Sequence, residues 1–344
     1  MIYMSFFIGL LLICKGGDWF VDAASKLSET LGIPKSVIGA TIVSFATTMP
    51  EIIVSVAAAL QGHSVMAIGN AVGSVSANTG IILAISLFFL PVAIKREEYF
   101  LKIVLYLGTL IMLFFSFTDR IFDKSDCLLL LLAGILFLIE NVKNALREKN
   151  SLQTKRKKEN SRRTNENDRS GIKKRKEEIK RGRKNKEKIY KKDTILKTLF
   201  WFCIGAISIV AGSELLVHSA CEIAEKLHIS EDIISVTIVA MGTSLPELVT
   251  TITAIIKKES SLSVGNIVGA NMIDAAFILP ICTLLSGEKL PVSAQMAGID
   301  MPLCMLISAL ALLPMLIRKE IKRRDGILVF SIYAGYLFYI GMLF

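Results

Sequence analysis

Two short motifs that combine a carboxylate, a proline and hydroxyl side chains recur at a spacing of 196 residues. The first is Thr-Thr-Met-Pro-Glu over residues 47–51, and the second is Thr-Ser-Leu-Pro-Glu over residues 243–247. Each lies inside a long apolar stretch, where inserting a carboxylate into a membrane costs about 2.5–3.5 kcal/mol. An ionisable residue in that setting predicts a function. Glu51 and Glu247 together therefore predict a cation site built from two halves of one chain.

The residues around each glutamate supply the other groups that a cation needs. Pro50 and Pro246 lack a backbone N–H and clash with the preceding turn, so we expect each helix to kink or open there. The opening frees backbone carbonyls, and the hydroxyls before each proline add neutral oxygens. Two carboxylates with neutral oxygens suit Ca²⁺, which takes about 6–8 oxygen ligands in flexible geometry. Mg²⁺ keeps its waters and is less suited, and zinc would need His or Cys.

The histidines and cysteines lie apart from these motifs. We expect the three histidines near the outer surface, as solvated or interfacial side chains: His63, His218 and His228. The six cysteines have no paired spacing, so we expect small buried side chains rather than a metal cluster or a disulfide framework. No nucleophile–base pair and no phosphate-binding loop are present in the sequence. We expect no enzyme, no catalytic residue and no cofactor.

The two motifs belong to a longer internal repeat. Residues 16–78 align with residues 212–274 without a gap, and 19 of the 63 aligned pairs are identical. Chance similarity between apolar segments would not place Pro, Glu, Gly and Asn in register, so the repeat indicates a duplication. Asn78 is replaced by Asp274 in the second copy. Small residues, which let helices approach closely, recur on the helix after each glutamate: Gly69-Asn70 and Gly73, matched by Gly265-Asn266 and Gly269.

Composition and hydropathy predict an all-α integral membrane protein. Apolar residues make up 53% of the chain and occur in blocks long enough to cross a bilayer. We expect ten transmembrane helices, near residues 3–24, 36–60, 64–91, 100–118, 126–143, 195–221, 232–256, 260–285, 294–317 and 327–343. Five helices in each half is an odd number, so the halves form inverted-topology repeats with the site near the midplane between them.

Charge divides the chain into three regions. It has 40 Lys/Arg and 30 Asp/Glu, of which 23 and 8 lie between residues 143 and 197, leaving 17 and 22 elsewhere. We expect a first five-helix repeat over 1–143 (motif 41–78), a basic loop over 144–194, and a second repeat over 195–344 (motif 237–274). The positive-inside rule places the basic loop in the cytoplasm and both termini outside.

The basic loop has too few apolar residues to form a core, so we expect a disordered or partly helical connector. Binding to anionic lipid headgroups is an alternative, because a Lys or Arg near such a surface contributes about 1 kcal/mol. Nucleic acid is the weakest alternative, since no aromatic residues interleave to stack on bases. We expect no nucleic-acid partner.

At these residues the chain resembles the cation/calcium exchanger superfamily, whose repeats carry G-T-S-L-P-E followed by G-N-x-x-G-S-N. It is most similar to the compact prokaryotic sodium/calcium exchangers, over both halves but not the basic loop. The resemblance implies an antiporter that exchanges Ca²⁺ for Na⁺ across the cytoplasmic membrane by alternating access, with its first and sixth helices sliding across the site. The oligomeric state stays open, and a monomer suffices.

The resemblance also implies roles for single residues. Glu51 and Glu247 would be the central Ca²⁺ ligands, with Thr47 and Thr243 giving backbone or hydroxyl oxygens. Flanking Na⁺ or H⁺ sites would involve Thr48, Ser74, Asn78, Ser244 and Asp274. The chain departs from the family pattern at Ala46, Val75 and Ala270. Ala270 removes a hydroxyl from a flanking site, which leaves the coupling ion open.

Three alternatives remain at this stage. A buried Asp274 could stay protonated and only hydrogen-bond, or it could couple transport to protons. The same fold would then exchange Ca²⁺ for H⁺, or would depend on K⁺. A remote alternative from another class is a membrane scaffold that binds anionic lipid through its basic loop, which would leave the matched polar motifs unexplained.

Overall fold

The computed structural model describes residues 2–89, 96–165, 195–215, 218–219, 222, 226, 240–318 and 322–343. These residues are almost entirely helical, as predicted. Within them, eight helices are long and apolar enough to cross a membrane, or nine if the bent pair over Lys35–Thr47 and Met49–Leu60 is one span. The predicted span over 232–256 lies partly outside the described residues, so ten spans are not all accounted for.

The first half contains α1 to α8, in which two predicted spans, 36–60 and 64–91, extend through breaks or π-helical turns. Its elements are α1 (Ile2–Leu31), α2 (Lys35–Ile38), η1 (Gly39–Val43), α3 (Ser44–Thr47), α4 (Met49–Leu60), α5 (Ser64–Ala77), η2 (Asn78–Leu83), α6 (Ala84–Phe89), α7 (Arg96–Ser116), β1 (Ile121–Phe122) and α8 (Lys124–Asn165). The predicted fifth span continues as helix to Asn165, well into the basic segment. The rest of that segment, to residue 194, lies outside the described residues.

Around its glutamate, the second half repeats the element order of the first half. Its elements are a helix over Ile195–Leu215, then α11 (Ala240–Thr243), α12 (Leu245–Ile256), α13 (Ser260–Ile273), η4 (Asp274–Ile278), α14 (Leu279–Ser286), β2 (Leu290–Pro291), η5 (Met296–Asp300), α15 (Met301–Arg318) and α16 (Arg323–Leu343). Here η4 begins 196 residues after η2, and α12 begins 196 residues after α4. The repeat seen in the sequence is therefore repeated in the helix boundaries.

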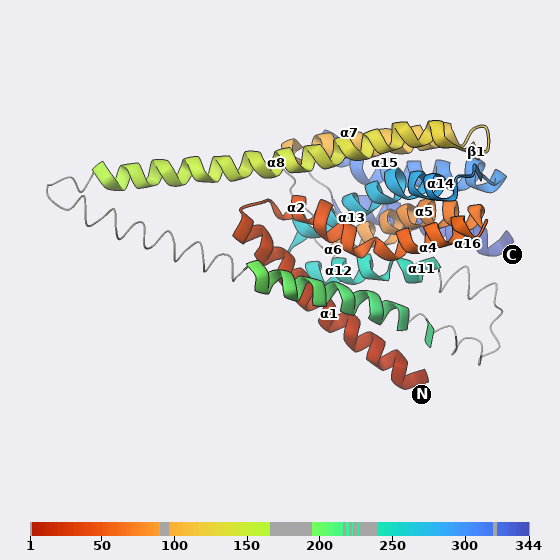
Figure 1. Cartoon of the computed structure of the whole chain (residues 1–344), viewed down its shortest axis with the longest axis horizontal. Helices are drawn as coiled ribbons and strands as arrows, with labels where there is room; N and C mark the ends of the chain where they lie inside the picture. The colour runs from red at the N-terminus through yellow and green to blue at the C-terminus, as the bar shows by residue number, and fades with distance from the viewer. Residues whose placement is uncertain are drawn as a thin grey trace.

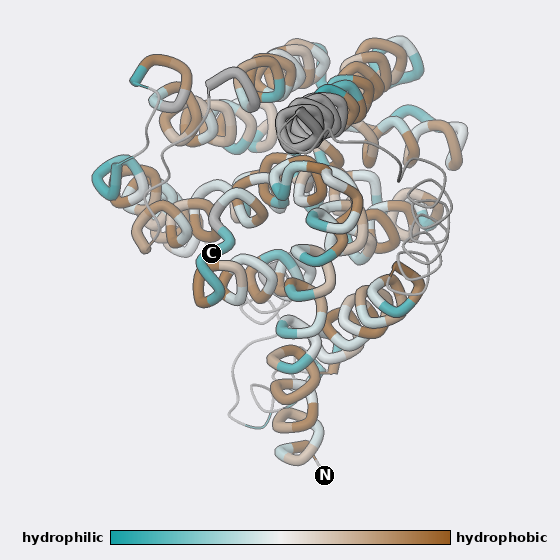
Figure 2. Tube along the Cα trace, turned by 90° about the vertical axis from the view of Figure 1, so that its left-hand side faces the viewer, coloured by the Kyte–Doolittle hydropathy of each residue, from teal (hydrophilic) through white to brown (hydrophobic). Residues whose placement is uncertain are grey.

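Two spans form the centre of the bundle. The spans over Ser64–Phe89 and Ser261–Ser286 have 72% and 83% of their residues buried, whereas the six other spans have at most 39%. The outer helices expose large apolar side chains, such as Phe7, Phe115 and Leu128, and Figure 2 shows hydrophobic residues along the helices that are seen nearly end-on. That surface suits a lipid solvent, which needs no polar covering.

Opposite ends of the bundle carry different loops. β1 pairs antiparallel with β2, which joins the loop after α7 to the loop after α14. Figure 1 shows β1 at one end of the bundle and the far end of α8 projecting from the other, with both termini toward the β1 end. In the loop that contains β1, Asp123 accepts hydrogen bonds from the hydroxyl and backbone N–H of Ser125, which lower the pKa of Asp123 to about 2.

Candidate cation site

The predicted break is present at each proline. A single residue separates α3 from α4, and Pro50 lies in the first turn of α4. The two helices are bent by 45° relative to each other. α11 and α12 are broken in the same way before Pro246. The residues at the breaks, Thr48 and Ser244, share nearly the same backbone angles, with φ −85° and −87°. Each glutamate follows its proline and so lies in the first turn of a helix.

The two glutamates are bonded crosswise between the repeats. Thr48 Oγ1 donates to Glu247 Oε1 at 3.1 Å, and Ser244 Oγ donates to Glu51 Oε1 at 3.4 Å. Both carboxylates are fully buried. Thr48 and Ser244 are equivalent positions, as are Glu51 and Glu247, so the internal repeat relates the two bonds. The structure thus brings both halves of the predicted site into one place.

A second symmetric pair of contacts involves two asparagines. Thr47 Oγ1 donates to Asn266 Oδ1 at 3.3 Å, and Thr243 Oγ1 donates to Asn70 Oδ1 at 3.4 Å. Asn70 Nδ2 also donates to the backbone oxygen of Glu51 at 3.1 Å. These two asparagines were not among the predicted site residues. The signal was available, because each belongs to a Gly-Asn pair that the repeat preserves.

The third pair of equivalent positions, Asn78 and Asp274, has an amide in one repeat and a carboxyl in the other. Asn78 and Asp274 are buried at the starts of the π-helical segments η2 and η4. Asn78 Nδ2 donates to Asp274 Oδ2 at 3.4 Å. π-helical turns are rare and frequently occur at functional sites. Ser74 is buried one turn before Asn78, and its counterpart Ala270 is buried one turn before Asp274.

Four oxygens of this cluster are buried and have no hydrogen-bond partner in the described part of the chain. They are Glu51 Oε2, Glu247 Oε2, Asn78 Oδ1 and Asp274 Oδ1. A buried polar group without a partner costs about 1–3 kcal/mol, and a charged one costs more. A bound cation would satisfy such oxygens, so the residues fit an oxygen-preferring ion.

The histidines of the described residues do not contribute to this cluster. His63 and His218 are exposed, and His228 lies outside the described residues. Among the described residues, no group of three or more His, Cys, Asp or Glu side chains is arranged to hold a metal. Neutral oxygens would therefore complete the coordination shell of an ion held by the two glutamates.

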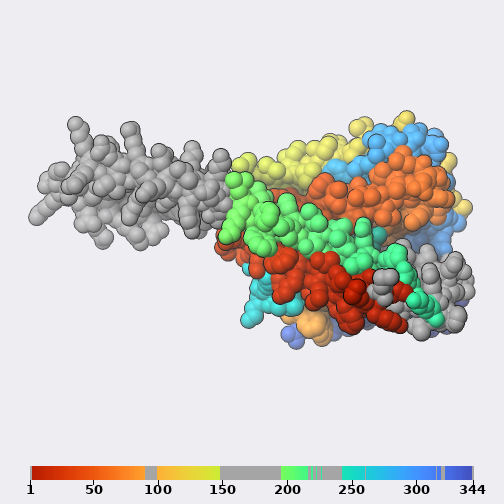
Figure 3. Space-filling model, turned by 60° about the horizontal axis from the view of Figure 1, so that its bottom comes forward, coloured from red at the N-terminus to blue at the C-terminus, as the bar shows by residue number. Residues whose placement is uncertain are grey.

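Beside the site, α1 and the helix over Ile195–Leu215 cross at close range. A Cβ at Gly16 would lie 3.0 Å from the backbone oxygen of Gly205, and a Cβ at Gly212 would lie 2.9 Å from that of Gly9. Positions 9 and 205 are equivalent in the repeat, as are 16 and 212. Figure 3 shows α1 lying along this helix on the surface of the bundle. Glycines on both sides let the two backbones approach without interlocking side chains.

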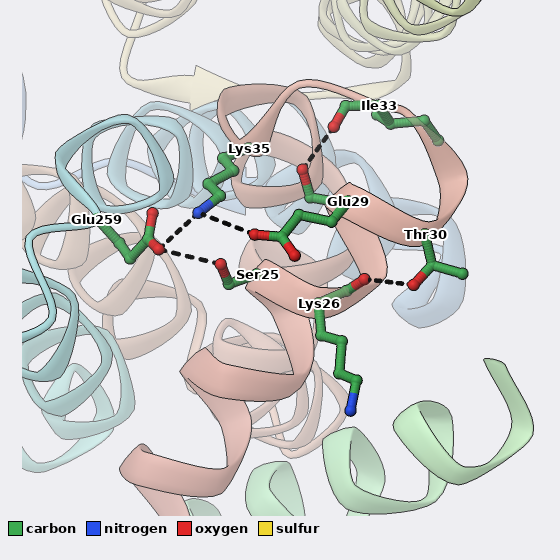
Figure 4. A network of polar contacts seen from close by, with 8 residues as sticks. Ser25, Lys26, Glu29, Thr30, Ile33, Lys35 and Glu259 are labelled. Carbon is green, nitrogen blue, oxygen red and sulfur yellow. Dashed lines mark hydrogen bonds and ion pairs between the residues drawn. The ribbon is translucent and has the colours of Figure 1, made fainter. Parts of the chain in front are cut away.

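Polar contacts tie the other end of α1 to the segment between α12 and α13. Figure 4 shows Lys35 and Ser25 both reaching Glu259, at 2.5 and 3.0 Å from its Oε1. Lys257 Nζ lies 2.7 Å from Asp22 Oδ1 and 3.5 Å from Asp18 Oδ1. Ser25, Lys35 and the residues from Lys257 to Glu259 lie in connections predicted to face the cytoplasm, whereas Asp18 and Asp22 lie inside the predicted span 3–24. No equivalent ion pair joins the other half in the described residues.

Comparisons with known proteins identify similar chains. Residues 1–141 and 197–342 match the family described as sodium/calcium exchanger protein. The sodium/calcium exchanger MaX1 of Methanosarcina acetivorans is 32% identical over 350 residues, covering 97% of each chain. The inner membrane protein YrbG of Escherichia coli is 29% identical over 339 residues, covering 98% of this chain and 95% of its own. A structure of the sodium-calcium exchanger NCX_Mj soaked with Na⁺ and Sr²⁺ superposes with a TM-score of 0.77 and 27% identity, covering 98% of this chain and 97% of that one.

Proposed function

The chain belongs to the sodium/calcium exchanger protein family, and we propose that it is a secondary active antiporter that exchanges Ca²⁺ for Na⁺ across the cytoplasmic membrane by alternating access. The bonding of the glutamates carries this proposal. Within the described residues, Glu51 and Glu247 each accept a hydrogen bond at one oxygen from a hydroxyl of the opposite repeat, and the other oxygen is buried without a partner. Two such oxygens can bind a divalent cation, and the cation can be released when the repeats move apart.

The ion assignments follow the two kinds of polar contact. Glu51 and Glu247, with oxygens from Thr47 and Thr243, form the central Ca²⁺ site, because only this pair supplies two carboxylates. The flanking Na⁺ sites use mainly neutral oxygens as ligands. Those sites use Thr48, Ser74, Asn78, Ser244 and Asp274.

The proposed architecture is ten helices in two inverted repeats, 1–143 and 195–344, joined by the cytoplasmic basic loop 144–194. The pairing of β1 with β2 and the position of both termini toward that end of the bundle support an outer face there. Sliding of α1 and the helix over Ile195–Leu215 switches access, which the glycine-lined crossing supports because it presents little to interlock.

The test is ⁴⁵Ca²⁺ uptake into vesicles loaded with Na⁺. We expect rapid uptake by the unmodified chain and loss of at least about 100-fold in Glu51→Gln and Glu247→Gln, because each variant removes one of two carboxylate charges from a buried site. Glu288→Gln, which changes an exposed acid in a loop, is the matched control and should keep full uptake. Normal uptake in both site variants would refute the assignment of the glutamates.

Proton coupling is the second candidate. It is favoured by one observation: the Asn78–Asp274 pair and the Ser74/Ala270 difference make the flanking sites unequal. The same vesicles, free of Na⁺ but carrying an outward H⁺ gradient, separate the two coupling ions. Uptake driven by H⁺ and not by Na⁺ would replace Na⁺ coupling and leave the Ca²⁺ site in place.

A further inference from the structure

A second buried polar chain adjoins the Asn78–Asp274 pair and reaches two outer helices. Asn271 Nδ2 donates to Thr79 Oγ1 at 2.9 Å and lies 3.3 Å from the hydroxyl of Tyr106. The Tyr106 hydroxyl is in turn 2.9 Å from Ser308 Oγ. All four side chains are at most 1% exposed. The chain thus joins α13, η2, α7 and α15 inside the bundle.

This polar chain holds the two spans that carry Asn78 and Asp274. Asn271 lies one turn before Asp274, and Thr79 directly follows Asn78. The contact between Asn271 and Thr79 is therefore a neighbour of the contact between Asn78 and Asp274, and a movement of one changes the other. Tyr106 and Ser308 lie outside both repeat motifs, on α7 and α15, so they attach the pair to the outer part of the bundle.

The internal repeat makes the polar chain one-sided. The positions equivalent to Asn271 and Thr79 are Val75 and Ala275, which are apolar and equally buried. Apolar packing is therefore sufficient to hold the corresponding helices on that side. The polar chain is present only where the carboxyl of Asp274 replaces an amide, which connects it with the asymmetric part of the site rather than with helix packing in general.

We propose that Tyr106 is a positioning residue of the flanking ion site. Its hydroxyl, fixed by Ser308, holds Asn271 against Thr79 and thereby keeps Asn78 and Asp274 in bonding distance. The inference rests on the proposed function, because it assumes that Asn78 and Asp274 help to bind Na⁺. Loss of the hydroxyl leaves Ser308 and Asn271 with fewer buried partners, so the pair loosens while Glu51 and Glu247 keep their contacts.

The chain offers a closely matched control for this residue. Tyr99 lies two turns earlier on α7, is buried at 3% exposure, and donates its hydroxyl to the backbone oxygen of Ser261 at 3.2 Å. Tyr99 and Tyr106 thus both form hydrogen bonds from α7 to α13. Tyr99 reaches the first turn of α13, and Tyr106 reaches its last turn. Only Tyr106 contacts the residues beside Asp274. Tyr99→Phe and Tyr106→Phe remove the same atom at two places.

The experiment measures ion binding directly, as thermal stabilisation of the purified full chain by added Na⁺ or Ca²⁺. We expect Tyr106→Phe to raise the Na⁺ concentration for half-maximal stabilisation by about 3- to 10-fold, the range for one buried hydrogen bond. Its half-maximal Ca²⁺ concentration should stay within about 2-fold. Ser308→Ala should show the same pattern, and Tyr99→Phe should change neither value.

Each outcome bears on one of the two proposals. Equal shifts in Tyr106→Phe and Tyr99→Phe, or no shift in Tyr106→Phe, would overturn the positioning role, because the effect would then be general packing or absent. An equal loss of Na⁺ and Ca²⁺ affinity in Tyr106→Phe would overturn it too. If neither ion stabilises the unmodified chain, the proposed cation site itself is wrong, and the positioning role falls with it.

Discussion

The glutamates of this protein accept hydrogen bonds from hydroxyls of the opposite repeat. Thr48 reaches Glu247, and Ser244 reaches Glu51. Each half of the site is therefore incomplete without the other, and a relative movement of the halves changes both carboxylates at once. This property suits a transporter, whose site must form and open in each cycle.

The difference between Ser74 and Ala270 leads to a prediction at the residue scale. Ala270→Ser would restore a hydroxyl at the position equivalent to Ser74, where a neutral oxygen can join a flanking Na⁺ site. We expect the Na⁺ concentration for half-maximal ⁴⁵Ca²⁺ uptake to fall by about 2- to 10-fold, as for one added polar contact. Ala311→Ser, in a buried position of α15, is the control. An unchanged Na⁺ dependence would mean that this hydroxyl has no part in coupling.

Residue identity was predictable where the repeat preserved it. Pro, Glu and the hydroxyl residues stand in register in the sequence, and they lie together in the structure. The partners of these residues were not predictable, because crosswise bonding depends on how two helices face each other. Tyr106 and Ser308 carry no signal at all, since they lie outside the repeat and resemble ordinary residues of apolar helices.

At the scale of elements, sliding of α1 would break its polar contacts with the segment between α12 and α13. Lys257 binds two acids of α1 one turn apart, Asp18 and Asp22, and its Nζ also lies 2.9 Å from the backbone oxygen of Asp18. These contacts must break in every cycle under the proposed mechanism. Partly exposed ion pairs are worth about 0–1 kcal/mol each, so they can slow α1 without locking it.

Lys257→Gln should therefore speed exchange with little effect on stability. We expect the maximal rate of ⁴⁵Ca²⁺ uptake to rise by up to about 5-fold, which corresponds to about 1 kcal/mol. The thermal midpoint should stay nearly unchanged. Lys258→Gln is the matched control, because Lys258 is the next residue and forms no ion pair in the described part of the chain. Equal rates for the two variants would contradict a role for these contacts in the sliding of α1.

Elements were predicted unevenly for physical reasons. The helix breaks at Pro50 and Pro246 followed from the missing N–H and were found where expected. The π-helical turns at Asn78 and Asp274 were not predicted, because they depend on neighbouring helices rather than on a local residue type. The helix α8 exceeds its predicted span, since hydropathy marks only the part of a helix that matches lipid.

At the scale of the whole molecule, two packed central spans carry Asn78 and Asp274, the broken helices beside them carry the two glutamates, and the outer spans face lipid. The internal repeat explains why polar contacts come in pairs related by 196 residues. It also explains why departures such as Asn78 and Asp274 stand out. Hydropathy and the repeat predicted the membrane class and the central helices, whereas the pairing of β1 with β2 rests on two-residue segments too short to leave a sequence signal.

Obligatory exchange is the central claim, and it is tested by following both ions at once. The purified chain is placed in proteoliposomes loaded with ²²Na⁺, and ⁴⁵Ca²⁺ is added outside. We predict that ²²Na⁺ efflux requires external Ca²⁺, that ⁴⁵Ca²⁺ influx requires internal Na⁺, and that Glu51→Gln abolishes both. Influx of ⁴⁵Ca²⁺ at the same rate without internal Na⁺, and with no ²²Na⁺ efflux, would contradict Na⁺/Ca²⁺ antiport.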